Sequence, residues 1–273
     1  MTKETIMTTS HVTSPDDILR ENVQKVLMVD CPTKRTFSGT LLSAVITSIL
    51  AVTVLAAPAS AKDTKNPDRL LSVDFQPRQV VKIESGDFHF KPGQIGPIHN
   101  HPASTIGYVT KGAILYQVEG RDLQLLNTGD AFYEPSGPRI MRFDNASPTE
   151  EAIFIDFNLL QNGEAFIAFE KPPTENIDRR PLLTKKFSAQ NIDGADIYRH
   201  TIQPDGKQYL EFTQPIAGYV AEGVVELRVN GKRLQSLKAG ENFYQIEGGS
   251  GGVLVNTSSD ISAKVVVFNL NTP

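Results

Sequence analysis

The sequence has very little cysteine, because Cys31 is the single one among 273 residues. Cys31 precedes the cleavage site predicted below, so the mature chain has no disulfide bond and no cysteine nucleophile. The sequence also lacks an excess of positive charge, since the formal net charge is −4 and acidic and basic residues are mixed throughout. That balance excludes nucleic acid as a partner. A phosphate-binding glycine loop is absent as well.

The N-terminal segment, residues 1–61, has the order of a secretory signal peptide. Two positive charges stand at 34–35, an uncharged apolar run covers 41–57, and an A-x-A triplet ends at Ala61. We expect cleavage after Ala61 and a periplasmic or secreted mature protein. A membrane anchor formed by the uncleaved segment is the alternative, because the run is slightly short for a membrane span and slightly long for a signal core. Met28 is an alternative start, since signal peptides rarely carry a long extension before the charged residues.

The remainder of the chain contains an internal repeat. Residues 107–133 align without a gap with residues 218–244, and 12 of the 27 positions are identical. A match of this length indicates duplication of one unit.

Each copy has the pattern of β-structure. Short runs of β-branched and aromatic residues are separated by turns that contain glycine. We expect strands at 80–84, 113–118, 123–126, 140–143, 152–157, 197–201, 224–229, 234–237, 252–256 and 263–268. Many short strands at close spacing predict sandwiches or barrels, here two of them. Proline and charge are concentrated between the copies, so we expect a first barrel at 70–169, a linker at 170–186 and a second barrel at 187–273.

The first copy resembles the cupin superfamily of jelly-roll barrels. The first motif of that family is a glycine, five residues, His-x-His, three or four residues, a glutamate, six residues and a glycine. This chain has Gly93, His99, His101, Thr105 and Gly112 at the matching positions. Only the glutamate is missing, because Thr105 stands in its place.

The second motif of the family is also incomplete. Gly129, Pro135 and Gly137 fit its glycine, five residues and Pro-x-Gly. The histidine position that follows falls on Ile140, or on Met141 if one residue is inserted. The match covers roughly residues 78–160, and the repeat extends it more weakly to about residue 270. The resemblance implies an all-β fold of two tandem cupin barrels, a bicupin with a degenerate metal motif.

In the intact family motif the ligands bind a divalent transition metal, namely Fe, Mn, Ni, Cu or Zn. His99 and His101 are two residues apart, so in a strand their imidazoles point to the same face. The resemblance therefore implies a metal bound by His99 and His101. Glu134 is the candidate third ligand or acid–base residue, and Tyr133 and His89 are other candidates.

We also expect Thr105, Tyr133 and Met141 to line the ligand pocket. In the second copy, Leu210 and Phe212 stand at the positions of the two histidines, and Gln245 stands at that of Glu134. The lumen of the second barrel should therefore be apolar.

Two classes of function follow from the resemblance. The first is an exported, metal-dependent bicupin with a small organic substrate and oxygenase, isomerase or lyase chemistry. The second is a non-enzymatic barrel that binds or senses a small ligand, with a scaffold for homodimerisation as a lesser variant because sheet edges can pair across a two-fold axis. Analysis of bound metals separates the first class from the second.

Overall fold

The computed structural model describes residues 66–246 and 251–273. The predicted signal peptide, its cleavage after Ala61 and the alternative start at Met28 lie outside the described residues. No helix that could span a membrane is found in the described part of the chain. Every regular element between residues 66 and 246 and after residue 250 is a β-strand, which confirms the predicted all-β class.

The strands form three sheets. The largest sheet has the order β16-β13-β18-β11-β1-β8-β3-β6, with β10 paired to β1. Its strands are β1 (Asp68–Phe90), β3 (Thr105–Lys111), β6 (Ala131–Glu134), β8 (Ala152–Leu160), β10 (Asp178–Pro181), β11 (Lys185–Ile202), β13 (Ile216–Glu222), β16 (Asn242–Gln245) and β18 (Ala263–Asn271).

Two smaller sheets complete the barrels. One has the order β5-β4-β7-β2-β9 and consists of β2 (His99–Asn100), β4 (Ala113–Val118), β5 (Gln124–Asn127), β7 (Arg139–Asn145) and β9 (Ala168–Phe169). The other has the order β12-β17-β14-β15 and consists of β12 (Lys207–Leu210), β14 (Val224–Val229), β15 (Lys232–Lys238) and β17 (Gly252–Asn256).

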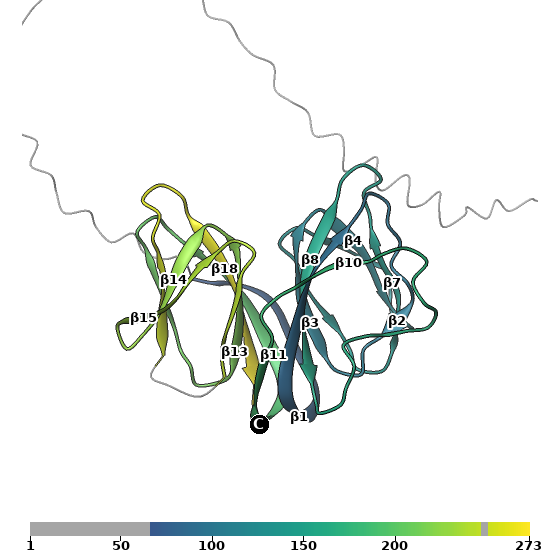
Figure 1. The fold of residues 1–273 in the computed structure, drawn as a ribbon, viewed down its shortest axis with the longest axis horizontal. Helices are drawn as coiled ribbons and strands as arrows, with labels where there is room; N and C mark the ends of the chain where they lie inside the picture. The colour runs from purple at the N-terminus through teal and green to yellow at the C-terminus, as the bar shows by residue number, and fades with distance from the viewer. Residues whose placement is uncertain (1–65, 247–250) are drawn as a thin grey trace, which may run out of the picture. The chain divides into compact units, whose positions relative to one another are not determined.

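Each small sheet covers one half of the large sheet, and this produces two barrels (Figure 1). The first barrel combines β1, β8, β3 and β6 with the five-stranded sheet. The second combines β16, β13, β18 and β11 with the four-stranded sheet. Alternate residues of β8 and β18 face the lumen or the opposite side, as the two-residue period of a strand requires. The prediction of two tandem jelly-roll barrels is confirmed.

The two barrels are joined by β1 and β11, which are much longer than the sequence predicts. They span 23 and 18 residues and pair antiparallel, with Gln79 opposite Asn191 and Val80 opposite Gln190. The sequence predicts only residues 80–84 and 197–201 as strands here, because polar residues interrupt the apolar alternation. The paired residues belong to different copies of the repeat, so the extension depends on a contact that local pattern does not contain.

Three apolar clusters hold the fold together. One fills the first barrel and is rich in phenylalanine, with Phe132, Phe143 and Phe154 among its members. A second fills the second barrel with mainly aliphatic side chains. The third joins residues of both halves of the large sheet, where the ring centroid of Phe157 lies 4.8 Å from that of Phe268. The interface between the barrels is therefore itself a hydrophobic core.

Four strands of the first barrel have exact counterparts in the second. The alignment of the sequence repeat, continued along the chain, carries both ends of β3, β4, β6 and β8 onto the ends of β13, β14, β16 and β18. Positions in the two barrels can therefore be compared residue by residue.

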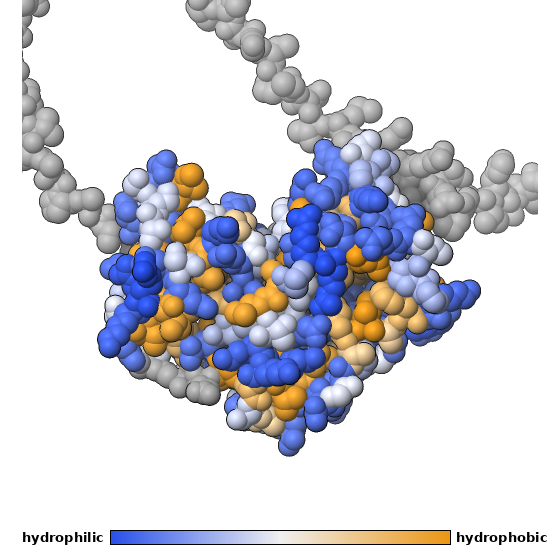
Figure 2. All heavy atoms as spheres, in the orientation of Figure 1, coloured by the Kyte–Doolittle hydropathy of each residue, from blue (hydrophilic) through white to orange (hydrophobic). Residues whose placement is uncertain are grey.

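The segment expected to be a linker is partly structured. β10 lies inside it and pairs with β1, placing Arg179 opposite Phe88. On the molecular surface, apolar residues lie in several areas between hydrophilic ones (Figure 2). The large apolar side chains exposed on the described residues, such as Ile95, Leu125 and Leu234, come from separate turns and strands.

Candidate metal centre

His99 and His101 lie together in the lumen of the first barrel. β2 is only two residues long, and it pairs with β7 on one side and β9 on the other, so that His99 lies opposite both Ile140 and Phe169. Both histidines are buried, with exposures of 7% and 1%. Their ring centroids are 5.2 Å apart. The i, i+2 spacing thus places both imidazoles on the same side, as the sequence predicts.

Glu134 enters the same site from β6. In the register of the large sheet, Thr105 on β3 lies opposite Glu134 on one side and opposite Asn158 on the other. Directly opposite residues share a face of the sheet. The carboxylate that the family motif places at Thr105 is therefore supplied here from the neighbouring strand.

The three side chains are close enough to bind one metal ion. One ligand atom from each of His99, His101 and Glu134 lies within 4.8 Å of the others, and all three residues are buried. Glu134 Oε2 is 3.1 Å from His101 Nε2, and Glu134 Oε1 is 3.7 Å from His99 Nε2. Two imidazoles and one carboxylate are a common ligand set for divalent transition metals.

The Nδ1 atom of each of the two histidines is hydrogen-bonded to another group. His99 Nδ1 donates to the carbonyl oxygen of Pro97 at 2.8 Å. His101 Nδ1 donates to the carbonyl oxygen of Phe166 at 2.9 Å and to Asn158 Oδ1 at 2.8 Å. A carbonyl oxygen can only accept, so Nδ1 carries the hydrogen in both rings. In the neutral tautomer each Nε2 is then a free lone pair aimed at the site.

The turn after Glu134 is tied to the histidine segment. Gly137 N–H donates to the carbonyl oxygen of His101 at 3.0 Å, and Ser136 Oγ donates to the carbonyl oxygen of Pro102 at 2.6 Å. Gly137 has a φ of 101°, a conformation that favours glycine. The Pro-x-Gly of the second motif thus fixes the position of Glu134 relative to His101.

Electrostatics couple Glu134 to His101. Burial alone would raise the pKa of Glu134, but the positive charge of His101 and the neighbouring His99 ring outweigh it and lower the pKa to about 2. Burial alone would lower the pKa of His101, but the charge of Glu134 raises it to about 9. Glu134 is therefore ionised at neutral pH, which suits a metal ligand and does not suit a general acid.

Two further polar residues extend the site along β8. Asn158 Nδ2 donates to Asp156 Oδ2 at 3.3 Å, and the Gly86 N–H donates to Asp156 Oδ1 at 3.2 Å. Thr105 Oγ1 donates to Asn158 Oδ1 at 2.8 Å. Burial raises the pKa of Asp156 to about 7, against the lowering effect of the positive charge on His101. Asn158, held by Asp156, orients the His101 ring.

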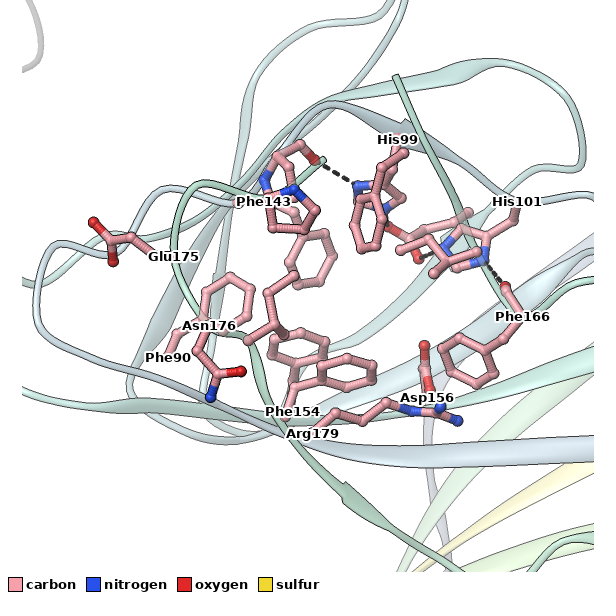
Figure 3. A pocket seen from close by; sticks show the side chains of 18 of the residues that line it. Phe90, His99, His101, Phe143, Phe154, Asp156, Phe166, Glu175, Asn176 and Arg179 are labelled. Carbon is pink, nitrogen blue, oxygen red and sulfur yellow. Dashed lines mark hydrogen bonds and ion pairs between the residues drawn. The ribbon is translucent and has the colours of Figure 1, made fainter. Parts of the chain in front are cut away.

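A cavity of about 650 Å³ opens beside the three candidate ligands. Figure 3 shows the two histidine rings on one side of it and Phe154, Asp156 and Arg179 on the other. Six phenylalanines contribute to its wall. A volume of this order is typical for a site that binds a small molecule.

Three residues expected to line the pocket lie elsewhere. Thr105 is fully buried in the row between Glu134 and Asn158. Tyr133 points to the other face of β6, where its ring stacks on Phe75 at 5.9 Å. Met141 is half-buried on β7 and is not part of the cavity lining, whereas Phe143, two residues on, is. The strand period explains the outcome for Tyr133, since it neighbours the lumen-facing Glu134.

The other candidate helper, His89, is outside the site. It lies between Glu151 and Asp87, at 3.1 and 3.2 Å.

The sequence interpretation missed Asp156, Asn158, Phe166 and Arg179. A signal for the first two was present, because Asp156 and Asn158 are the polar residues, two apart, of the apolar strand β8. Phe166 lies in the irregular segment before β9, and Arg179 lies on β10 within the expected linker. No local pattern marks either of them.

In the second barrel the equivalent positions form part of the core. Leu210 and Phe212 are buried in its apolar cluster, as the sequence predicts for these positions. Among residues 66–246 and 251–273, His99, His101 and Glu134 are the one group of three or more potential metal-ligating side chains.

The fold and the site together define a class: a pair of tandem jelly-roll barrels with two histidines and a carboxylate in the lumen of the first. Residues 86–158 match the sequence profile described as "Cupin domain". The first barrel therefore contains a cupin domain, and the second barrel repeats its fold. A search of curated protein sequences finds no match.

Several solved structures are similar to this chain in fold. Hazelnut (Corylus avellana) vicilin has a TM-score of 0.52 and 12% identity, over 70% of this chain and 75% of that one. AerE from Microcystis aeruginosa has a TM-score of 0.51 and 15% identity, over 76% and 98%. A point mutant of Bacillus subtilis oxalate decarboxylase OxdC has a TM-score of 0.51 and 13% identity, over 80% and 79%. Identities this low show a shared fold and nothing about function.

Proposed function

We propose that the first barrel binds one divalent transition-metal ion through His99 Nε2, His101 Nε2 and a carboxylate oxygen of Glu134. The observation that carries this proposal is the convergence of these atoms within 4.8 Å in a buried site. Both Nδ1 atoms are already hydrogen-bonded, so each Nε2 is directed at the ion.

The residues present fit such an ion. Glu134 Oε1 is buried and has no hydrogen-bond partner among the described residues. A buried charged oxygen without a partner is costly, and a metal ion would satisfy it. Fe, Mn, Ni, Cu and Zn all accept two imidazoles and a carboxylate.

We propose further that a small organic molecule occupies the cavity beside the ion, as the substrate of oxygenase, isomerase or lyase chemistry. His99, His101 and Glu134 would hold the ion, and the ion would supply Lewis-acid polarisation of an oxygen of a bound molecule. The cavity lining supplies six phenylalanine side chains, and Asp156 and Arg179 supply charge.

Export is a second part of the proposal, and it rests on the sequence of residues 34–61 alone. The order of charge, apolar run and A-x-A triplet supports a periplasmic or secreted mature protein. A homodimer, and membrane attachment through an uncleaved segment, also stay predictions. Mass measurement of the mature N-terminus tests cleavage, since an uncut chain in the cytoplasm would contradict export.

The metal proposal is tested on the full chain, purified without a metal-binding tag. Elemental analysis is expected to find close to one transition-metal ion per chain, and addition of the matching ion to stripped protein should raise the melting temperature. If no metal copurifies, and Fe(II), Mn(II), Ni(II), Cu(II) and Zn(II) all leave the melting temperature unchanged, the proposal is wrong.

A further inference from the structure

Six of the residues that line the cavity are phenylalanines. Phe154 lies at the centre of this wall, with ring centroids 4.9 Å from Phe88, 5.2 Å from Phe90 and 4.6 Å from Phe143. All four line the cavity, together with Phe166 and Phe169. Aromatic faces and edges pack best against another flat ring.

The second barrel shows that the fold does not require these rings. The cross-strand pair that corresponds to Phe88 and Phe154 is His200 and Val265. The position of Phe143 is occupied by Leu254, which is buried in the core of the second barrel. The aromatic wall therefore belongs to the barrel that has the metal-ligating residues.

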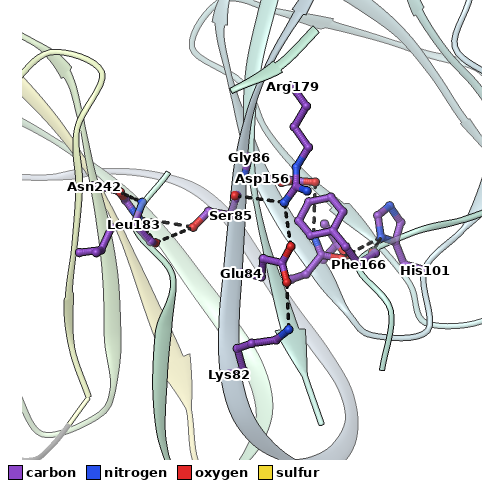
Figure 4. Close-up of polar contacts among 12 residues, drawn as sticks. Lys82, Glu84, Ser85, Gly86, His101, Asp156, Phe166, Arg179, Leu183 and Asn242 are labelled. Atoms are coloured by element: carbon purple, nitrogen blue, oxygen red, sulfur yellow. Dashed lines mark hydrogen bonds and ion pairs between the residues drawn. The ribbon is translucent and has the colours of Figure 1, made fainter. Parts of the chain in front are cut away.

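One positive side chain, Arg179 on β10, lies over the same cavity. Its Nη2 donates to Glu84 Oε1 at 3.0 Å and to the carbonyl oxygen of Ser85 at 3.3 Å (Figure 4). Its Cζ lies 3.6 Å from the centre of the Phe166 ring. The carbonyl oxygen of Phe166 in turn accepts from His101 Nδ1, so a single residue connects the guanidinium to the metal-ligand end of the cavity.

Arg179 has hydrogen-bonding capacity left over. Both of its hydrogen bonds use Nη2, so Nη1 has no hydrogen-bond partner among the described residues. A guanidinium with free donors binds a carboxylate more strongly than a neutral group. Asp156 is an acidic residue of the same lining, and burial raises its pKa to about 7, which weakens its repulsion of an anion at neutral pH.

We propose that this cavity binds a small aromatic carboxylate, with its ring against Phe154 and its carboxylate at Arg179. Arg179 is then the residue that makes the site selective for a negative charge. This inference rests on the proposed function, because a metal ion at His99, His101 and Glu134 supplies the rest of the positive charge.

Four probes test the ligand class on the full chain loaded with Zn(II). Benzoate has the ring and the carboxylate, benzyl alcohol has the ring without a charge, benzylamine has the ring with a positive charge, and acetate has the carboxylate without a ring. Titration calorimetry is expected to show benzoate binding about tenfold or more tightly than each of the other three.

Two variants test the role of Arg179. Arg179→Gln should reduce the preference for benzoate over benzyl alcohol to about twofold or less, and Arg179→Lys should retain part of it. Arg180→Gln is the matched control. Arg180 is the next residue, and among the described residues it pairs only with Asp178. Its side chain is 57% exposed, and it does not line the cavity. Its replacement should leave the preference unchanged.

The outcomes separate this inference from the proposed function. If zinc binds but benzyl alcohol, benzylamine or acetate binds as tightly as benzoate, the ligand class is wrong and the metal site stands. The proposed role of Arg179 is wrong if the Arg179→Gln variant keeps the full preference for benzoate over benzyl alcohol and its melting temperature shows that it is folded. If zinc does not bind, the proposed function fails. A preference of the metal-free protein for benzoate that Arg179→Gln removes would still support the anion site.

Discussion

The two barrels have four strands with matching bounds, but they differ in what fills the lumen. In the first, His99, His101 and Glu134 lie beside an open cavity. In the second, Leu210 and Phe212 occupy the histidine positions and pack into an aliphatic core. The jelly roll is stable with either filling, because the strand pairing and the inter-barrel core are common to both. The site is therefore an addition to the fold and not a requirement of it.

The comparison also identifies an uncharged counterpart of the Glu134 carboxylate. Gln245 is the counterpart of Glu134 in the repeat, since each is the last residue of its strand, β16 or β6. The two side chains have almost the same shape, and only one carries a charge. The chain thus contains its own control for the effect of that charge.

The largest effect is expected from removing both histidines. The double change His99→Ala and His101→Ala should lower metal affinity by about 100-fold or more, because loss of a direct ligand exceeds the roughly 10–100-fold effect of outer groups. Elemental analysis and metal-dependent melting temperature measure it. His200→Gln, in the second barrel, should leave metal binding unchanged. Retention of metal by the double variant would contradict the assignment.

The next effect is expected at Glu134. Glu134→Gln gives the first barrel the residue of the second, and it should lower metal affinity by about 10- to 100-fold, since an amide is a weaker ligand than a carboxylate. Isothermal titration with Zn(II) measures the change. The reciprocal variant, Gln245→Glu, should bind no additional metal. Equal affinity of Glu134→Gln and the unaltered chain would show that the carboxylate is not a ligand.

A smaller effect is expected at Asn158. Asn158→Ala removes the acceptor from His101 Nδ1 and should lower metal affinity by about tenfold, with Phe166 still holding the ring. Asn269→Ala is the matched control. Asn269 lies at the corresponding position of β18, and in that barrel Phe212 stands at the position of His101. If Asn269→Ala weakens metal binding as much as Asn158→Ala does, the effect is one of stability and not of ligand orientation.

The pH dependence of metal binding tests the coupling of His101 to Glu134 in the first barrel. In the metal-free protein, the raised pKa of His101, about 9 against an ordinary 6.5, means that the charged pair stabilises the fold below about pH 6.5 and is lost as pH rises through 9. Because a bound ion displaces the proton that makes His101 positively charged, the apparent Zn(II) affinity should increase by about tenfold per pH unit from pH 7 to 8. Titrations at three pH values measure the slope. A flat profile would mean that His101 is neutral before the ion binds.

Much of the fold follows from local sequence. The alternation of apolar residues and the glycine turns predict short strands at 113–118 and 224–229, and the structure has β4 and β14 at those bounds. The repeat also indicates two similar units. The lengths of β1 and β11 were not predictable, because each is extended by pairing with the other across the barrel interface.

The site was only partly predictable. The His-x-His spacing is sufficient to place His99 and His101 on one face of the chain, because the period of a strand is a local property. The role of Glu134 is not local. It lies opposite Thr105 only because β3 and β6 pair in one register, and a slip by one residue would turn its carboxylate out of the lumen.

By itself, the sequence determined the class of fold and the two histidines, because side-chain alternation and residue spacing are encoded within a few residues. Only the tertiary structure distinguished Glu134 from the other candidates for the third ligand, Tyr133 and His89. It also decided that Asp156 and Asn158 support His101 and that Arg179 lies above the cavity. Each of these depends on which strands become neighbours, and that depends on the packing of the whole chain. The missing glutamate at position 105 is thus replaced across a strand pair, by Glu134 on β6.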